Sequence, residues 1–258
     1  MEYIPGIAFA LLLVLTAVFF RRSRRRAVER EAWRSSPIPA FWLRILRRRL
    51  PILGRLPPTV RRRLFRHIKV FLAEKHFTAC GGIRNVSDTM AVTIAGHACL
   101  LLAGRVGSLC FPTVQSVLVY PDYFYSPVSR FSGGGAVIVG NEARVGEASP
   151  MGNVVVSWRE VLQSNAFAEN GHNVVLHEFA HHIRPAGAAL TAALDAGFRR
   201  LRANPNDPAL DSYGATHREE FWAVSVEAFF ENSVKLREEH PELYAAMSDF
   251  FALSPADW

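Results

Sequence analysis

Cysteine is scarce in this chain of 258 residues, and its three cysteines, Cys80, Cys99 and Cys110, form no paired CxxC spacing. This scarcity argues against a disulfide framework and against a cysteine-ligated metal site, and it favours buried free thiols in a reducing compartment. Internal repeats are also lacking, and glycine and proline mark no second domain boundary after residue 60. Because half of the residues are hydrophobic (50%) and 21% are charged, the composition predicts one large globular domain with appendages.

Charge is absent from residues 4–20, a run of 17 residues at the short end of what can span a bilayer about 30 Å thick. Arginines follow this run and no positive charge precedes it, so the positive-inside rule predicts an uncleaved anchor rather than a signal peptide. We therefore expect residues 1–20 to be the transmembrane anchor of a single-pass protein whose catalytic domain lies in the cytoplasm. A secreted orientation and a buried helix are the alternatives.

Positive charge is concentrated in residues 21–69, which hold sixteen arginines and one lysine against two glutamates. This segment carries +15, so the rest of the chain carries −8 within an overall net charge of +7. Arginines beside an anchor favour anionic lipid head groups, at about 1 kcal/mol each. The apolar residues among them, such as Trp42, Ile45 and Leu46, would then lie in the membrane interface. We predict membrane lipid as a partner, and no direct binding of nucleic acid.

Prolines punctuate residues 35–60, so residues 21–58 are expected to form a juxtamembrane linker and residues 59–258 the folded domain. Hydrophobic periodicity then predicts a succession of elements. These are a helix to about residue 75, a buried helix at 90–104, strands at 114–124 and 153–158, a hairpin or edge strand at 130–146, and helices at 173–184 and 218–230. Helices, then strands, then helices again indicate an α+β fold with its sheet before the helix at 173–184.

The stretch "NVVLHEFAHHI" at residues 173–183 contains an HExxH motif. His177 and His181 are four residues apart, so both lie on one face of a helix and can direct a nitrogen at one Zn²⁺. Glu178 would reach the water in the open coordination position and act as general base. Apolar neighbours predict that this helix is buried, where unpartnered polar groups are costly and metal ligation would offset that cost. A core helix whose polar groups meet other side chains is the alternative, and His182 is not needed for the chemistry.

A zinc site of this kind needs a third protein ligand, and several downstream acids are candidates. They are Asp211, Glu219, Glu220, Glu227 and Glu231. On a helix over residues 218–230, Glu220 and Glu227 share a face, whereas Glu219 turns about 100° away. One of the pair could ligate zinc while the other accepts a hydrogen bond from a ligating histidine, and spacing alone does not choose between them.

Several separated stretches, "NVVLHEFAHHI", "DSYGATHREEFWAVSVEAFFE" and "HPELYAAMSDFF", resemble in their order the MtfA-like family, the Mlc titration factor A proteins or glucose-regulated metallopeptidases. The resemblance covers about residues 50–258. It implies a zincin-like fold with a mixed sheet, Zn²⁺ as cofactor, and Glu220 as the third ligand beside His177 and His181. It also implies that Tyr213 stabilises the oxyanion and that Glu227 supports a ligand. The chain departs from the family pattern at residues 182–185, and segment 184–212 is shorter than usual.

The resemblance implies a zinc metallopeptidase with aminopeptidase-like action on short peptides, and a peptide or protein as substrate. The alternative is a membrane-tethered regulatory protein that binds a cytoplasmic transcription repressor such as Mlc, with peptidase activity secondary. A pseudo-enzyme in which zinc only stabilises the fold is disfavoured, because a scaffold has no use for Glu178.

Overall fold

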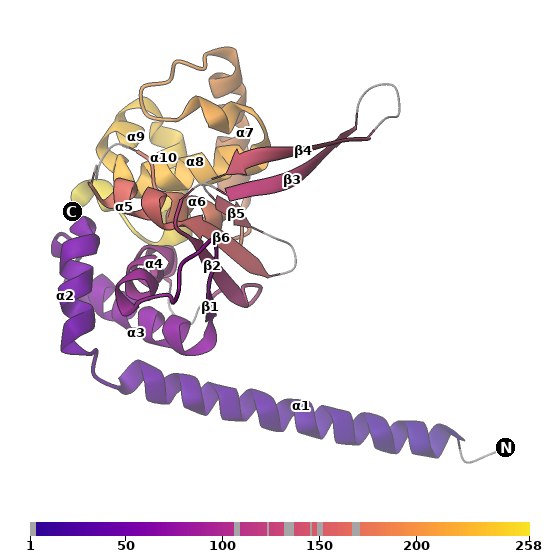
Figure 1. Cartoon of the computed structure of the whole chain (residues 1–258). Coiled ribbons are helices and arrows are strands. Elements are labelled where there is room, and N and C mark those ends of the chain that lie inside the picture. The colour runs from indigo at the N-terminus through magenta and orange to yellow at the C-terminus, as the bar shows by residue number, and fades with distance from the viewer. Residues whose placement is uncertain are drawn as a thin grey trace.

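The computed structural model describes residues 4–105, 109–122, 124–131, 137–144, 146–148, 152–166 and 171–258, and the side chains within 14–105, 109–122, 152–164 and 171–258. Helices flank a small sheet in this structure (Figure 1). The helices before the sheet, with the strand that follows them, are α1 (Ile4–Ser35), α2 (Ala40–Arg49), η1 (Pro51–Gly54), α3 (Pro58–Glu74), β1 (His76–Ala79) and α4 (Asp88–Leu100). The other strands are β2 (Ser116–Tyr120), β3 (Phe124–Phe131), β4 (Val137–Arg144), β5 (Gly146–Ala148) and β6 (Asn153–Ser157). The remaining helices are α5 (Trp158–Ala166), α6 (Val174–Ala180), α7 (Ala188–Ala203), η2 (Ser212–Ala215), α8 (Arg218–Glu231), α9 (Ser233–Glu239), α10 (Pro241–Phe251) and η3 (Pro255–Asp257).

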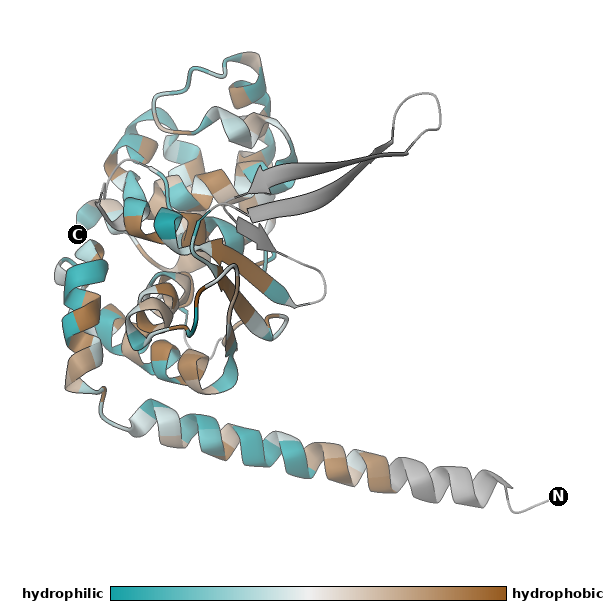
Figure 2. Ribbon diagram, in the orientation of Figure 1, coloured by the Kyte–Doolittle hydropathy of each residue, from teal (hydrophilic) through white to brown (hydrophobic). Residues whose placement is uncertain are grey.

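The sheet is mixed, with strand order β1-β2-β6-β5. β1 pairs with β2 and β2 with β6 in parallel, whereas β5 runs antiparallel to β6. Valines alternate inward along the two central strands, so Val117, Val119, Val154 and Val156 are fully buried. Figure 2 shows these central strands as largely hydrophobic. The predicted α+β class and mixed sheet are confirmed.

The hairpin expected at residues 130–146 is the antiparallel pair β3–β4, which begins earlier, at Phe124. It projects away from the four-stranded sheet (Figure 1). The strand expected at 114–124 is therefore divided into β2 and the start of β3. The cysteines are free, and Cys99 and Cys110 are buried as predicted, while Cys80 is partly exposed.

The predicted membrane anchor is wrong. In the described part of the chain, no helix is both long enough and apolar enough to cross a membrane. The run belongs to α1, a single helix of 32 residues that continues from apolar residues 14–20 into an arginine-rich half (Figure 2). Neither the single-pass anchor nor the localisation derived from it is retained.

The segment expected to be a linker is helical and contributes to the core. Leu46 of α2 and Leu50, which follows the helix, are buried against α4, and Ile45 and Trp42 pack against the same core rather than in a membrane interface. Gly96 of α4 makes room for this contact, because a Cβ atom there would lie 2.8 Å from Leu46 Cδ2. The expected role for these apolar residues at a lipid surface is therefore corrected: their partner is the domain itself.

Helix α1 is attached to α3 through polar contacts. Arg30 pairs with Glu74, and Arg66 Nη2 lies 2.9 Å from Glu31 Oε1. Lys69 donates through its Nζ to the carbonyl oxygen of Arg34, at 2.7 Å. Several residues of the arginine-rich segment therefore form ion pairs and hydrogen bonds within the chain.

Candidate metal site

Helix α6 carries the HExxH motif and is shorter than predicted, ending at Ala180 rather than near residue 184. The side chain of Asn173 caps its first turn by accepting a hydrogen bond from the backbone nitrogen of Leu176, at 3.1 Å. Helix α6 lies between strands β5 and β6 on one side and helix α8 on the other. This packing buries the apolar residues of the helix and Glu178, while His177 and His181 stay partly exposed on the face toward α8.

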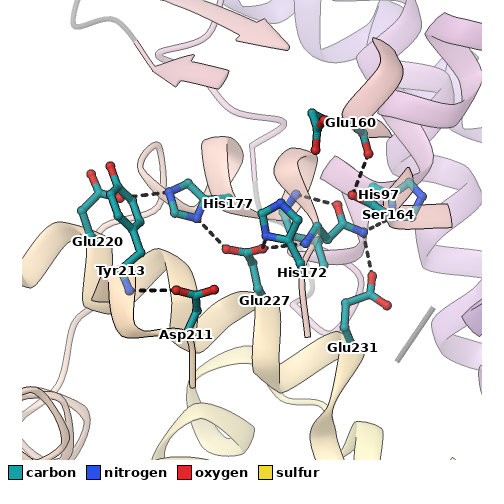
Figure 3. A network of polar contacts seen from close by, with 12 residues as sticks. His97, Glu160, Ser164, His172, His177, Asp211, Tyr213, Glu220, Glu227 and Glu231 are labelled. Atoms are coloured by element: carbon teal, nitrogen blue, oxygen red, sulfur yellow. Dashed lines mark hydrogen bonds and ion pairs between the residues drawn. The ribbon is translucent and has the colours of Figure 1, made fainter. Parts of the chain in front are cut away.

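Three potential metal ligands converge between α6 and the start of α8, and Figure 3 shows two of them, His177 and Glu220. One ligand atom each from His177, His181 and Glu220 lies within 4.8 Å of the other two. The Oε2 atom of Glu220 is 3.0 Å from His177 Nε2 and 3.7 Å from His181 Nε2. Two imidazole nitrogens and one carboxylate are the donor set of a catalytic zinc site, so the residues present fit such an ion.

Glu227 lies two helical turns after Glu220 on α8 and contacts the cluster through His177. It is 2% exposed, and its Oε1 atom accepts a hydrogen bond from His177 Nδ1 at 2.6 Å. Its Oε2 atom accepts from the backbone nitrogen of Asn173 at 2.5 Å and lies 3.0 Å from His172 Nδ1. Since Nδ1 of His177 is held by Glu227, its Nε2 atom is left to face Glu220 and the cluster.

The pKa of each residue in the cluster depends on the charges of its neighbours. Burial opposes protonation of His177, but hydrogen bonds with Glu220 and Glu227 outweigh burial and raise the pKa of His177 to about 10. Burial and the nearby charge of His177 lower the pKa of His181. Burial favours the neutral forms of Glu220 and Glu227, yet hydrogen bonds with histidines keep the pKa of each carboxyl below its usual value. A cation entering this cluster would therefore displace a proton from His177.

Tyr213 lies beside the cluster on η2. Asp211 fixes the start of this short helix by accepting a hydrogen bond from the backbone nitrogen of Tyr213, at 2.8 Å. The ring of Tyr213 is 54% exposed and its centroid is 6.1 Å from that of His177. Figure 3 shows Tyr213 and the neighbouring Asp211 together with His177 and Glu220.

Trp222 joins the two helices that carry the potential ligands. Its indole Nε1 donates to the carbonyl oxygens of Ala180 and Ile183, at 3.0 and 3.1 Å. Ala180 is the last residue of α6, and Ile183 lies in the turn that follows it. The contact holds the turn that contains His181 against α8.

The other candidates for a third ligand lie elsewhere. Glu219 is exposed on the neighbouring face of α8, and Glu231 accepts a hydrogen bond from Asn173 Nδ2 at 2.6 Å. His182, treated as a bystander from the sequence, turns away from the cluster and its Nδ1 atom lies 3.2 Å from Thr113 Oγ1.

Sequence reasoning missed His172 and Asn173, which join the network around Glu227, as well as His97, whose Nδ1 atom lies 2.9 Å from Asn173 Nδ2. A polar residue just before the buried motif helix was the available signal for Asn173, because N-cap positions favour asparagine. For His97, which comes from another helix, the sequence offered no comparable signal.

Comparison with known proteins gives a family. The model of the family described as "glucose-regulated metallo-peptidase M90" matches residues 20–252 of this chain. The chain therefore belongs to this family of metallopeptidases. An uncharacterised protein of Synechocystis is 31% identical over 238 residues, which cover 85% of this chain and 86% of that protein. Mlc titration factor A of Edwardsiella ictaluri is 27% identical over 80% of this chain and 85% of its own length. The similarity to MtfA-like proteins predicted from the motifs is confirmed.

Proposed function

We propose that the protein is a zinc-dependent peptidase with a zincin-like active site, in which His177, His181 and Glu220 hold the ion. The observation that carries this proposal is the convergence of one donor atom from each of these residues to within 4.8 Å. The hydrogen bond from His177 Nδ1 to Glu227 supports it, because such outer carboxylates orient ligating imidazoles.

Bound zinc would supply Lewis-acid polarisation of the peptide carbonyl and a lower pKa for the attacking water. Glu178 follows the first histidine and would accept the proton of that water as general base, then deliver it to the leaving amine. The hydroxyl of Tyr213, an exposed side chain beside His177, would donate a hydrogen bond to the oxyanion that develops on the carbonyl oxygen.

The proposed substrates are short peptides, cleaved in an aminopeptidase-like manner. The test compares peptides with a free N-terminus and the same peptides after N-acetylation, using the chain of 258 residues. We expect hydrolysis of the free peptides to disappear after removal of metal by a chelator and to return with stoichiometric Zn²⁺. Hydrolysis that persists in metal-free protein would contradict the zinc mechanism, and equal cleavage of acetylated peptides would contradict aminopeptidase action.

A second candidate function is binding of a transcription repressor. It is favoured by the relatives named Mlc titration factor A, which are similar to most of this chain. We propose that the chain binds an Mlc-like repressor through a surface separate from the catalytic groups. Binding of purified Mlc-like repressor should then be equal for the wild type and Glu178→Gln, whereas no measurable association at micromolar concentrations would reject this role.

A further inference from the structure

A cavity of about 760 Å³ lies beside the metal cluster. It is bounded by the end of α6 and the turn that follows, by α7, and by the first turn of α8. His181, one of the three potential ligands, forms part of its wall, and so does Glu219, the neighbour of Glu220. The cavity therefore opens directly next to the place where a scissile bond would lie, and its volume is typical of ligand sites.

The floor of the cavity is apolar and well supported. Phe198, Phe221 and Trp222 contribute aromatic rings that are otherwise buried, and Leu194 stands one turn before Phe198 on α7. The rings of Phe198 and Phe221 meet edge to face with centroids 5.9 Å apart. Gly197 permits this packing, since a Cβ atom there would come within 2.6 Å of the Phe221 ring.

Trp222 stiffens the floor further. Its ring stacks on Phe251 with centroids 5.8 Å apart, while its Nε1 donates to two carbonyl oxygens at the end of α6. An indole held by stacking on one face and by hydrogen bonds at its edge has little freedom to fill the cavity itself. The apolar surface is therefore preformed for an occupant.

The cavity wall also includes charged residues of α7, of α8 and of the turn after α6. Arg218 at the start of α8 forms an ion pair with Asp195 of α7, so these two charges satisfy each other across the opening. Arg184, which is exposed, belongs to the same wall. A cavity that is polar at its mouth and apolar at its base suits an apolar side chain that projects from a polar backbone, as in a peptide.

We infer that this cavity is the primary specificity pocket of the protein, taking a large apolar or aromatic side chain from the residue next to the scissile bond. This inference rests on the proposed peptidase function, because it assigns the occupant from the position of His181. Apolar pockets discriminate by about 10- to 200-fold for each methylene gained or lost. We therefore expect kcat/KM to be at least about tenfold higher for phenylalanine or leucine at that position than for alanine or glycine.

Leu194 provides the direct test, because it lines the cavity and is only partly buried. Leu194→Trp should fill the cavity and abolish the preference for large side chains, while Leu194→Ala should enlarge it and shift the preference toward tryptophan. Ala192→Trp is the matched control, since Ala192 lies on the same helix but is exposed and is not part of the cavity wall. Its preference should equal that of the wild type, and zinc content and thermal melting identify any variant that fails to fold.

A binding measurement separates failure of the pocket from failure of the proposed function. Zinc-loaded Glu178→Gln is titrated calorimetrically with two short peptides that differ only in phenylalanine or alanine at the tested position. Tighter binding of the phenylalanine peptide, lost in the double variant with Leu194→Trp, supports the pocket even where the wild type hydrolyses neither peptide. That outcome would overturn the peptidase function alone. Hydrolysis by the wild type without preference, together with equal binding of both peptides, would overturn the pocket and leave the peptidase function standing.

Discussion

Replacing Glu227 by glutamine should weaken zinc binding without removing a ligand. The carboxylate is buried and faces three donors, His177 Nδ1, His172 Nδ1 and the backbone nitrogen of Asn173. Glutamine has one acceptor oxygen, so its amide nitrogen would face at least one of these donors. Hydrogen bonds to charged groups contribute about 1.5–3 kcal/mol each, which corresponds to a loss of roughly 10- to 100-fold in zinc affinity.

The assay is competition for Zn²⁺ between the protein and a chromogenic chelator, with thermal melting of the metal-free protein measured in parallel. Glu231→Gln is the matched control, because Glu231 lies one turn further along α8 and contacts Asn173 Nδ2 at 2.6 Å. We expect it to change zinc affinity less than about threefold. Equal losses in the two variants, or unchanged affinity in Glu227→Gln, would refute the view that Glu227 orients His177.

Three further predictions concern the ligands, the oxyanion and the proton balance. Glu220→Ala should lose stoichiometric zinc by elemental analysis while Glu219→Ala keeps it, and the reverse result would move the third ligand to Glu219. Tyr213→Phe should lower kcat about 10²- to 10³-fold with zinc content and KM little changed, and a kcat equal to wild type would exclude an oxyanion role. Because the pKa of His177 is raised to about 10, the metal-free protein carries a proton there at neutral pH, and the ligating form is neutral. Calorimetry in buffers of different ionisation enthalpy should therefore show at least about one proton released per zinc at pH 7.5, with one proton fewer released once pH has risen through 10, and no release at pH 7.5 would contradict that pKa.

Local patterns predicted the elements near the site well. The spacing of His177 and His181 and the apolar residues around them predicted a buried helix, and the helical phase of residues 218–230 placed Glu220 and Glu227 on one face. The structure has α8 at Arg218–Glu231, with both carboxylates directed at His177. These features depend on neighbours within two turns of a helix, which a sequence displays directly.

Features that depend on distant packing were predicted less well. Leu46 and Leu50 lie between arginines, and only their contact with α4 shows that they belong to the core. The end of α6 likewise has a distant partner, because Trp222, forty-two residues after Ala180, donates to the carbonyl oxygen of Ala180. The cavity beside His181 could not be predicted because its walls come from separate segments, including residues 182–185, where the sequence departs from the family pattern.

The central claim is that His177, His181 and Glu220 hold zinc while Glu178 moves the proton, and Glu178→Gln tests it most directly. The measurement is peptide hydrolysis by zinc-loaded wild type and variant, with the zinc content of each sample determined on the same day. We predict equal zinc content and a loss of at least about 10²-fold in kcat for the variant. Hydrolysis at the wild-type rate by the variant would contradict the account.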